Sequence, residues 1–361
     1  MPSIEDAIDQ KIGQVRTETL DLSYGELTNL YANAELIIQP DYQRLFRWSV
    51  DQRSRIIESI LLELPIPQIF VIENENGVIE LIDGLQRLSS VMQFIDSRML
   101  NLDPLVLSGC DLVPELNGTS YSTLSLKLKL RLKRSSVRTT VIKRQSSSML
   151  RYEMFKRLNT GGSILAPQEI RNCTARMLGE SGINFYAFLQ ECAGWHGFQS
   201  CIEPLSQSDR EQRGDEELVL RFFAVKNAQS LFAGSVRDWL DDYMESVLLA
   251  RVQFDYSAER EVFQRLFDFL AAVMGPGAFV RYRGDVPVGA VAPAYFEAVT
   301  MGTLRAREAI PTDMDPERFR KAISETVQGD TFRAYTGPGA NSREKLEKRI
   351  DTIYNALLAA V

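Results

Sequence analysis

Residues 78–95 read VIELIDGLQRLSSVMQFI, an apolar stretch interrupted by Asp83-Gly84-Leu85-Gln86-Arg87. The β-rich residues before Asp83 favour a strand, and the apolar spacing after the interruption favours a helix from about Arg87 to Arg98. A strand that turns directly into a helix exposes backbone N–H groups at the positive end of the helix dipole. This turn is therefore a candidate phosphate site.

Each polar residue of the turn has a use in nucleotide chemistry. Gly84 lets the backbone approach a ligand closely, and Arg87 is the natural phosphate ligand. Asp83 can hold Mg²⁺ or orient a water, while Gln86 can position a water or read a base edge. No G-x-x-x-x-G-K-[ST] motif is present, so the charge has to come from arginine and backbone N–H groups. The structural alternative is that Asp83 caps the helix and that Arg87 pairs with Asp83 or Glu80.

A second loop upstream has a composition that suits the same ligand. Residues 39–49 read QPDYQRLFRWS, and they combine arginines, glutamines and aromatic residues. Arginine binds phosphate bidentately and stacks on rings. We therefore expect Gln43 and Arg44 to close on a nucleotide held at the turn. The alternative is a surface loop anchored to the core by an aromatic side chain.

The segments around these two loops predict a compact α/β domain. Residues 4–31 look like an amphipathic helix that becomes irregular, and 35–38 like a short strand. Ser49 can cap a helix over 50–64. The Asn-Gly pair at 76–77 predicts a hairpin between strands 68–73 and 78–82, and residues 136–143 predict a further strand.

Basic residues gather in one part of an acidic chain. Residues 127–157 contain eleven Lys and Arg against one Glu, so they carry +10 of a net charge of −7 and the rest carries −17. The alternation of residues 124–132, LSLKLKLRL, predicts a strand with bases outward, with a helix as the alternative. A basic stripe of this kind can bind a polyanion such as DNA, or it can pair with acidic segments of the same chain. The candidate DNA contacts are Lys127, Lys129, Arg131, Lys133 and Arg134.

The second half of the chain is predicted to be mostly helical. A helix over 147–158 ends at Asn159-Thr160-Gly161-Gly162, which is either a C-cap or a backbone nest that binds an anion beside Arg157. Further apolar stripes predict helices at 168–178, 215–232, 235–252, 257–274, 316–327 and 343–357. We therefore predict an α+β protein with an α/β domain at 1–145 and a helical domain at 146–361.

Composition excludes several classes of function. At 361 residues and 45% hydrophobic content, the chain suits two globular domains, and no apolar run approaches the roughly 20 residues of a membrane span. The acidic N-terminus and four cysteines without C-x-x-C spacing predict a cytoplasmic protein with reduced thiols. The single histidine, His196, is expected to be a packing or loop residue, and it excludes catalytic motifs in these residues that need several histidines.

Several motifs in order resemble one known family. They are Gln43-Arg44, Trp48-Ser49, Pro65-Ile66-Pro67, residues 82–88, Arg157 to Gly162, Gln168 to Asn172, and residues 336–343 with Arg349-Ile350. The pattern is similar to the domain-of-unknown-function 262 family, the N-terminal domain of GmrSD-type modification-dependent restriction systems, related to the ParB/sulfiredoxin fold. The chain departs from it at Leu85, where the family commonly has glutamine, and at Ala166-Pro167, where it usually has serine before the next motif. Leu85 is expected to point into the core, which leaves Asp83, Gln86 and Arg87 as the polar set; the alternative is that it touches the nucleotide, which would argue against hydrolysis.

The resemblance implies a nucleotide-binding module, with a nucleoside triphosphate and Mg²⁺ as cofactors, in an antiphage defence system. It extends the nucleotide site to Asn159, Thr160 and Gly161. Many members carry a His-Asn-His nuclease, which one histidine cannot form, so cleavage is expected from a separate nuclease or defence subunit.

Three hypotheses remain open at this point. The first is a switch driven by hydrolysis of the triphosphate. The second is a DNA- or nucleotide-sensing module that does not hydrolyse its ligand. The third is an antitoxin-like or assembly partner of a nuclease, with the turn purely structural. DNA is a candidate partner in the second, and an oligomer is compatible with all three.

Overall fold

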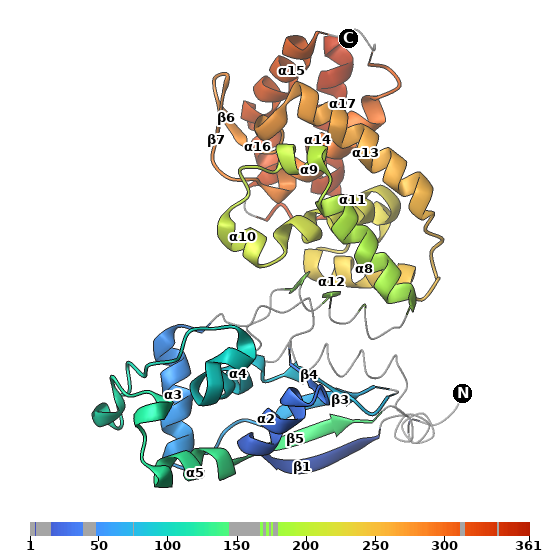
Figure 1. Ribbon diagram of the computed structural model, residues 1–361. Helices are drawn as coiled ribbons and strands as arrows, with labels where there is room; N and C mark the ends of the chain where they lie inside the picture. The colour runs from blue at the N-terminus through green and yellow to red at the C-terminus, as the bar shows by residue number, and fades with distance from the viewer. Residues whose placement is uncertain are drawn as a thin grey trace. The chain divides into compact units, whose positions relative to one another are not determined.

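The computed structural model describes residues 16–38, 48–74, 76–143, 180–310, 315–337 and 339–361, together with 4, 167–168, 171–172 and 175. The chain divides into two compact units, Met1–Ile164 and Leu165–Val361 (Figure 1). The predicted domain boundary at residues 145 and 146 stays a prediction, because residues 144–166 around it lie outside the described residues.

Unit 1 is built on a mixed five-stranded sheet with the order β1-β5-β3-β4-β2. Its strands are β1 (Thr17–Ser23), β2 (Leu36–Ile37), β3 (Ile69–Glu73), β4 (Ile79–Asp83) and β5 (Ser136–Ile142). The pairs β1–β5 and β3–β4 are antiparallel, whereas β3–β5 and β2–β4 are parallel. The predicted α+β class is confirmed, and the closer likeness to the ParB/sulfiredoxin fold stays an expectation.

Four helices of unit 1 share one apolar core with the sheet. They are α2 (Tyr24–Ala32), α3 (Val50–Leu61), α4 (Leu85–Asp96) and α5 (Leu126–Arg134). Leu27, Ile57 and Val91 of three different helices lie in this core with Val71 and Leu81 of the sheet, and all five are fully buried. The order of these elements puts the end of β4 directly before α4.

Local sequence signals explain the two best-defined connections. Ser49 and Gln52 form a reciprocal capping box at the start of α3, with N–H to side-chain oxygen distances of 3.3 and 2.9 Å. The hairpin between β3 and β4 turns through Gly77 at φ 80°, where the Asn74 N–H donates to the Val78 carbonyl over 2.8 Å. Both predictions are confirmed.

Two predictions in unit 1 differ from the structure. Residues 17–23, in a stretch expected to be helical at first and then irregular, form the edge strand β1, which is exposed over most of its length and pairs with β5. Residues 126–134, for which a strand was favoured and a helix was the alternative, form the helix α5, because Leu, Lys and Arg all favour helix and Ser125 caps the first turn. The alternation of leucines did not by itself distinguish a strand from a helix in this segment.

Unit 2 is helical, as predicted. Its helices are α8 (Glu180–Ala193), α9 (His196–Cys201), α10 (Gln207–Glu211), α11 (Gly214–Ala228), α12 (Val236–Leu248), α13 (Tyr256–Val273), α14 (Pro293–Ala306), α15 (Pro316–Gln328), α16 (Asp330–Thr336) and α17 (Arg343–Ala360). The sequence analysis did not anticipate the small hairpin of β6 (Arg281–Arg283) and β7 (Val286–Val288). Phe222, Phe263 and Phe267 are fully buried at the middle of its core.

None of the helices described is both long and apolar enough to cross a membrane. His196 was expected to be a packing or a loop residue; it is the exposed first residue of α9, so the packing alternative is wrong.

Candidate functional site

The candidate turn is a tight strand-to-helix junction. Asp83 ends β4, Gly84 has φ 105°, and α4 begins at Leu85 without a side-chain cap. A Cβ atom on Gly84 would lie 2.4 Å from Cγ2 of Ile69 on β3, so the chain passes β3 at a distance that only glycine allows. The first bond of the helix ladder joins the Leu88 N–H to the Gly84 carbonyl over 2.9 Å. The amide groups of the first turn of α4 precede this bond, at the end of a helix where anions typically bind.

Arg87 and Asp83 face each other across this junction. Nη2 of Arg87 lies 2.7 Å from Oδ2 of Asp83, and Nη1 donates to the Pro67 carbonyl over 3.2 Å. The Arg87 side chain is 14% exposed and the Asp83 side chain 41%. Arg87 therefore pairs with Asp83, as the structural alternative in the sequence analysis expected. Asp83 is the more exposed of the two side chains.

The other two residues of the turn point in different directions. Leu85 is 6% exposed and belongs to the core of unit 1, as expected. Gln86 accepts a hydrogen bond through Oε1 from the Trp48 N–H over 3.2 Å. This bond ties the end of the upstream loop to the turn. The two segments singled out by composition are thus in contact through Trp48 and Gln86.

A polar seam between α3 and α4 extends this contact, and the sequence analysis missed it. Nη1 of Arg53 donates to Oε1 of Gln93 over 2.8 Å, and Nε2 of Gln93 donates to the Asp103 carbonyl over 2.9 Å. Burial lowers the pKa of Arg53 from its ordinary value. The available signal was spacing, since Gln86 and Gln93 lie two helical turns apart on one face of α4.

Several predicted nucleotide ligands are not placed by the structure. Gln43, Arg44, Asn159, Thr160 and Gly161 lie outside the described residues. Their roles remain predictions.

The predicted basic stripe separates into two groups. Lys129 donates to the Ser122 carbonyl over 2.9 Å, and Arg131 lies 3.5 Å from Glu63 and donates to the Leu61 carbonyl over 3.2 Å. The other three bases, Lys127, Lys133 and Arg134, are exposed and have no ion-pair partner within the part of unit 1 that the structure describes. The alternative that the basic stripe pairs with acidic segments of the same chain also holds in part. Arg138 and Lys143, which belong to the same basic window, pair with Asp21 and Glu18.

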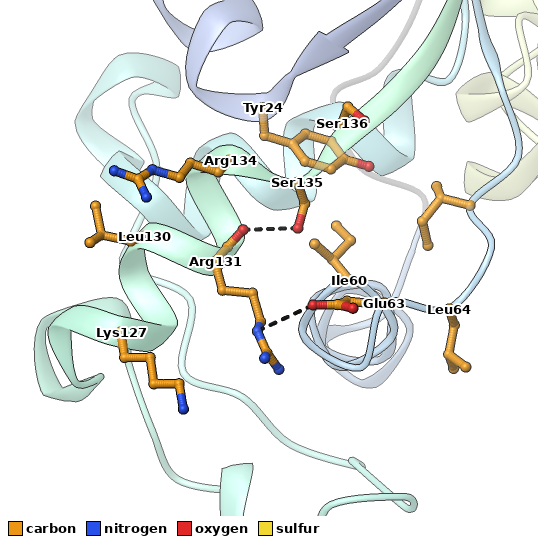
Figure 2. A pocket seen from close by; sticks show the side chains of 11 residues that line it. Tyr24, Ile60, Glu63, Leu64, Lys127, Leu130, Arg131, Arg134, Ser135 and Ser136 are labelled. Atoms are coloured by element: carbon orange, nitrogen blue, oxygen red, sulfur yellow. Dashed lines mark hydrogen bonds and ion pairs between the residues drawn. The ribbon is translucent and has the colours of Figure 1, made fainter.

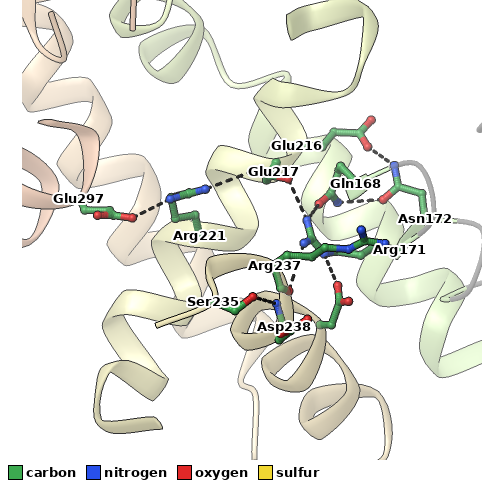
Figure 3. Close-up of polar contacts among 11 residues, drawn as sticks. Gln168, Arg171, Asn172, Glu216, Glu217, Arg221, Ser235, Arg237, Asp238 and Glu297 are labelled. Atoms are coloured by element: carbon green, nitrogen blue, oxygen red, sulfur yellow. Dashed lines mark hydrogen bonds and ion pairs between the residues drawn. The ribbon is translucent and has the colours of Figure 1, made fainter. Parts of the chain in front are cut away.

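In unit 2, the motif at 168–172 enters a chain of buried charges (Figure 3). Arg171 lies 2.6 Å from Asp241 and 2.9 Å from Glu217, and its side chain is 3% exposed. Glu217 lies 3.2 Å from Arg221, which in turn lies 2.7 Å from Glu297. We call six side chains the buried ion chain: Asp241, Arg171, Glu217, Arg221, Glu297 and Arg349.

Arg349 closes the buried ion chain at its far end. It pairs with Glu297, and its Nη1 donates to the Ala340 carbonyl over 3.0 Å. The Arg349 and Glu297 side chains are each 2% exposed. Three bases and three acids therefore balance inside unit 2, and two motif-like segments far apart in sequence are joined through α11 and α14. This arrangement is a scaffold rather than a ligand site.

Two neighbouring carboxyl groups of α11 have opposite pKa shifts. Burial raises the pKa of Glu216, which accepts from the Asn172 amide, and Arg213 lowers it less. Burial acts to raise the pKa of Glu217 too, but Arg171 and Arg221 outweigh it and lower that pKa below its ordinary value. Glu217 is thus held ionised by the buried ion chain.

Cysteine chemistry does not contribute a site in the described residues. Cys110, Cys192 and Cys201 are buried and free. Burial raises the pKa of Cys110 to about 11 and the pKa values of Cys192 and Cys201 to about 12, so all three stay protonated near neutral pH. Three or more metal-ligating side chains do not gather anywhere in the ranges described.

Comparison with protein families agrees with the resemblance of the motifs. Residues 26–175 match the model of the GmrSD restriction endonuclease, N-terminal domain. This segment is a GmrSD-type N-terminal domain. The match covers the Asp83–Arg87 turn, α5 and the Gln168 to Asn172 motif, but not the late segment with Arg349. No curated protein and no solved structure matches the chain.

Proposed function

We propose that the GmrSD-type domain binds a nucleoside triphosphate with Mg²⁺ at the Asp83–Arg87 turn and hydrolyses it. In this proposal the chain acts in the cytoplasm as a sensor or regulatory subunit of an antiphage system related to modification-dependent restriction. One observation carries it: a strand–glycine–helix turn that bears Arg87 lies inside a domain that matches a restriction endonuclease family.

The proposed binding step is an exchange of partners by Arg87. Asp83 and Arg87 neutralise each other at 2.7 Å, and a phosphate would offer the guanidinium a second anionic partner with matching bidentate geometry. The N–H groups at the start of α4 would take the remaining phosphate oxygens. The exchange would release the carboxylate of Asp83.

The released carboxylate suits a magnesium ion. Mg²⁺ typically takes one or two carboxylates together with phosphate oxygens and waters, so the single accessible carboxylate of Asp83 is a sufficient protein ligand. A bound Mg²⁺ would neutralise charge on the phosphates. Gln86 would orient the attacking water, and Gln43, Arg44, Asn159, Thr160 and Gly161 would complete the nucleotide site.

Phosphate release from GTP, ATP, CTP and UTP tests this proposal. Asp83→Asn and Arg87→Ala should each lower the rate at least about 100-fold, the effect of removing a group that stabilises the transition state. Arg87→Lys is the check on folding. It keeps the positive charge that contacts the Pro67 carbonyl, so it separates a loss of activity from a loss of fold. Arg98→Ala is the matched control, because Arg98 pairs with Asp96 at the other end of the same helix. Rates unchanged in the Asp83 and Arg87 variants would remove the turn from the mechanism.

DNA binding by α5 is the second candidate function, and the exposed Lys127, Lys133 and Arg134 favour it. Each phosphate contact contributes about 0.9 to the slope of log affinity against log salt concentration. Alanine at Lys127 or Lys133 should therefore reduce that slope by about one unit for DNA of any sequence. Affinity that does not depend on salt would contradict this function.

Cleavage is proposed to come from a separate nuclease or defence subunit. The observation behind this proposal is the single histidine of the 361 residues. Plasmid cleavage by the purified chain alone, with Mg²⁺ and nucleotide, would contradict it. Cleavage only after addition of the product of a neighbouring gene would support it.

A further inference from the structure

A pocket separate from the turn opens in unit 1 between the end of α3 and α5. Its volume is about 600 Å³, within the range of roughly 300–1,000 Å³ typical of small-molecule sites (Figure 2). Tyr24 at the start of α2 and Ser135 after α5 line it beside these two helices. None of the residues of the candidate turn lines it.

The lining combines apolar and basic side chains. Ile60, Leu64 and Leu130 form the apolar part, and Leu64 and Leu130 remain 42% and 37% exposed. Lys127, Arg131 and Arg134 line the same pocket, with Glu63 as the one acid among the lining residues. The net charge of the lining is therefore +2. A ligand that covers the leucines and neutralises the bases fits this mixture.

The alternation within α5 explains how leucines and bases come together here. Successive leucines two residues apart point about 200° apart on a helix, so they divide into two faces. Leu128 and Leu132 pack on the core of unit 1, whereas Leu126 and Leu130 are left 71% and 37% exposed. The second face is the one that meets the pocket, at Leu130. An exposed apolar face beside unpaired bases has no structural role within the described part of unit 1.

Hydrogen bonds hold the segments that line the pocket in place. The Tyr24 N–H donates to the Ser135 carbonyl over 3.0 Å, and the Ser135 hydroxyl donates to the Arg131 carbonyl over 2.8 Å. Arg131 reaches from α5 to the end of α3, where it pairs with Glu63 (Figure 2). Arg131 also donates to the Leu61 carbonyl. These bonds hold the backbone around the pocket and the position of Arg131.

Glu63 occupies a backbone conformation that favours glycine. Its φ is 59°, which places it in the left-handed region at the end of α3. A side chain with a Cβ atom is strained at such a position, whereas glycine adopts it freely. Its carboxylate is placed against Arg131, where it competes with any anion for the guanidinium.

We propose that this pocket binds a small organic phosphate, with its phosphate at Lys127, Arg131 and Arg134 and its apolar body against Leu64 and Leu130. The site is distinct from the nucleotide site proposed at Asp83–Arg87. No residue of the turn lines the pocket, so the two sites share no charged ligand.

Binding of ribonucleoside monophosphates, measured by calorimetry without Mg²⁺ on the full chain, tests the pocket. Lys127→Ala should weaken binding about tenfold, the effect of one charge-assisted hydrogen bond. Lys133→Ala is the matched control, because Lys133 lies on the same helix, is exposed and does not line the pocket. It should change affinity less than about twofold.

Two further variants separate this site from a general affinity for anions. Glu63→Gly should tighten binding, because it frees Arg131 and suits the backbone at φ 59°. Leu64→Ser should weaken binding of the monophosphates and leave that of inorganic pyrophosphate unchanged.

Three outcomes would overturn the proposal. No heat with any of the four monophosphates excludes the pocket as their site. Equal losses at Lys127 and Lys133 indicate a non-specific basic surface. Loss of binding in Arg87→Ala, with Lys127→Ala unaffected, assigns the ligand to the turn instead. A failed hydrolysis assay leaves the proposal on the pocket unaffected, because that assay tests the turn.

Discussion

Replacing Glu297 by glutamine removes one charge from the buried ion chain while nearly preserving the shape of the side chain. Glu297 bridges Arg221 and Arg349, and the Glu297 and Arg349 side chains are each 2% exposed. The variant leaves a buried guanidinium excess that water cannot reach. Breaking a buried ion pair by removing one partner costs about 3–5 kcal/mol. We expect about 3 kcal/mol, because the glutamine oxygen still accepts one hydrogen bond.

The expected loss is large enough to measure in two ways. Unit 2 spans residues 165–361. For a unit of this size, about 1 kcal/mol shifts the melting temperature by about 2–4 °C, so Glu297→Gln should lower it by about 6–12 °C. Urea denaturation followed by far-UV circular dichroism should show the same loss as a lower midpoint.

Controls distinguish lost charge pairing from general damage. Glu344→Gln should leave the midpoint unchanged, because its pair with Lys348 is exposed and screened by solvent. The double variant Glu297→Leu with Arg349→Met should be more stable than Glu297→Gln, since it removes the stranded charge of Arg349 together with its partner. A loss below about 1 kcal/mol in Glu297→Gln would refute the reasoning, because it would mean that other groups already solvate the arginines.

Three further predictions use matched pairs or a known direction of titration. Burial raises the pKa of Glu216 above 4.5, so the folded state keeps this proton to higher pH than the unfolded state. Ionisation therefore removes stability as the pH rises above about 4.5, and Glu216→Gln should gain stability over the wild type across that rise in urea titrations. Gly84→Ala should destabilise unit 1 more than Gly77→Ala in the same titrations, because both have positive φ but only at Gly84 does the new methyl meet Ile69 at 2.4 Å. Leu132→Ala should cost about 2–5 kcal/mol, whereas Leu126→Ala, at a 71% exposed site on the same helix, should leave the unfolding midpoint nearly unchanged.

In unit 1, local sequence signals predicted the elements correctly at positions where the backbone conformation accepts only a few residue types. Asn76-Gly77 predicted the hairpin, and Ser49 predicted the start of α3, because left-handed turns and N-caps accept few residues. Residues 124–132 failed for the opposite reason, since leucine and lysine suit a helix and an alternating strand alike. The strand at 17–23 was missed because an exposed edge strand lacks the apolar face that marks a buried one.

The candidate site shows a second limit of sequence reasoning. Asp83, Gln86 and Arg87 were found from their place after a strand, and this needs only local information. The contact of Gln86 with the Trp48 N–H joins residues 38 positions apart, and the buried ion chain joins residues up to 76 positions apart. Such pairs depend on the tertiary fold, so the sequence pointed to the motif residues without their partners.

The difference between the two motif arginines follows from what surrounds them. Arg171 meets two carboxylates at a 3% exposed site, and a ligand that took it would leave buried acids unpaired. Among the residues that the structure describes, Arg87 has one carboxylate partner. That partner, Asp83, is 41% exposed and can be solvated when the pair opens. A phosphate can therefore recruit Arg87 at low cost but not Arg171. By this argument, changes at Arg171 should reduce the amount of folded protein, whereas Arg87→Lys should leave folding intact and change only the response to nucleotide.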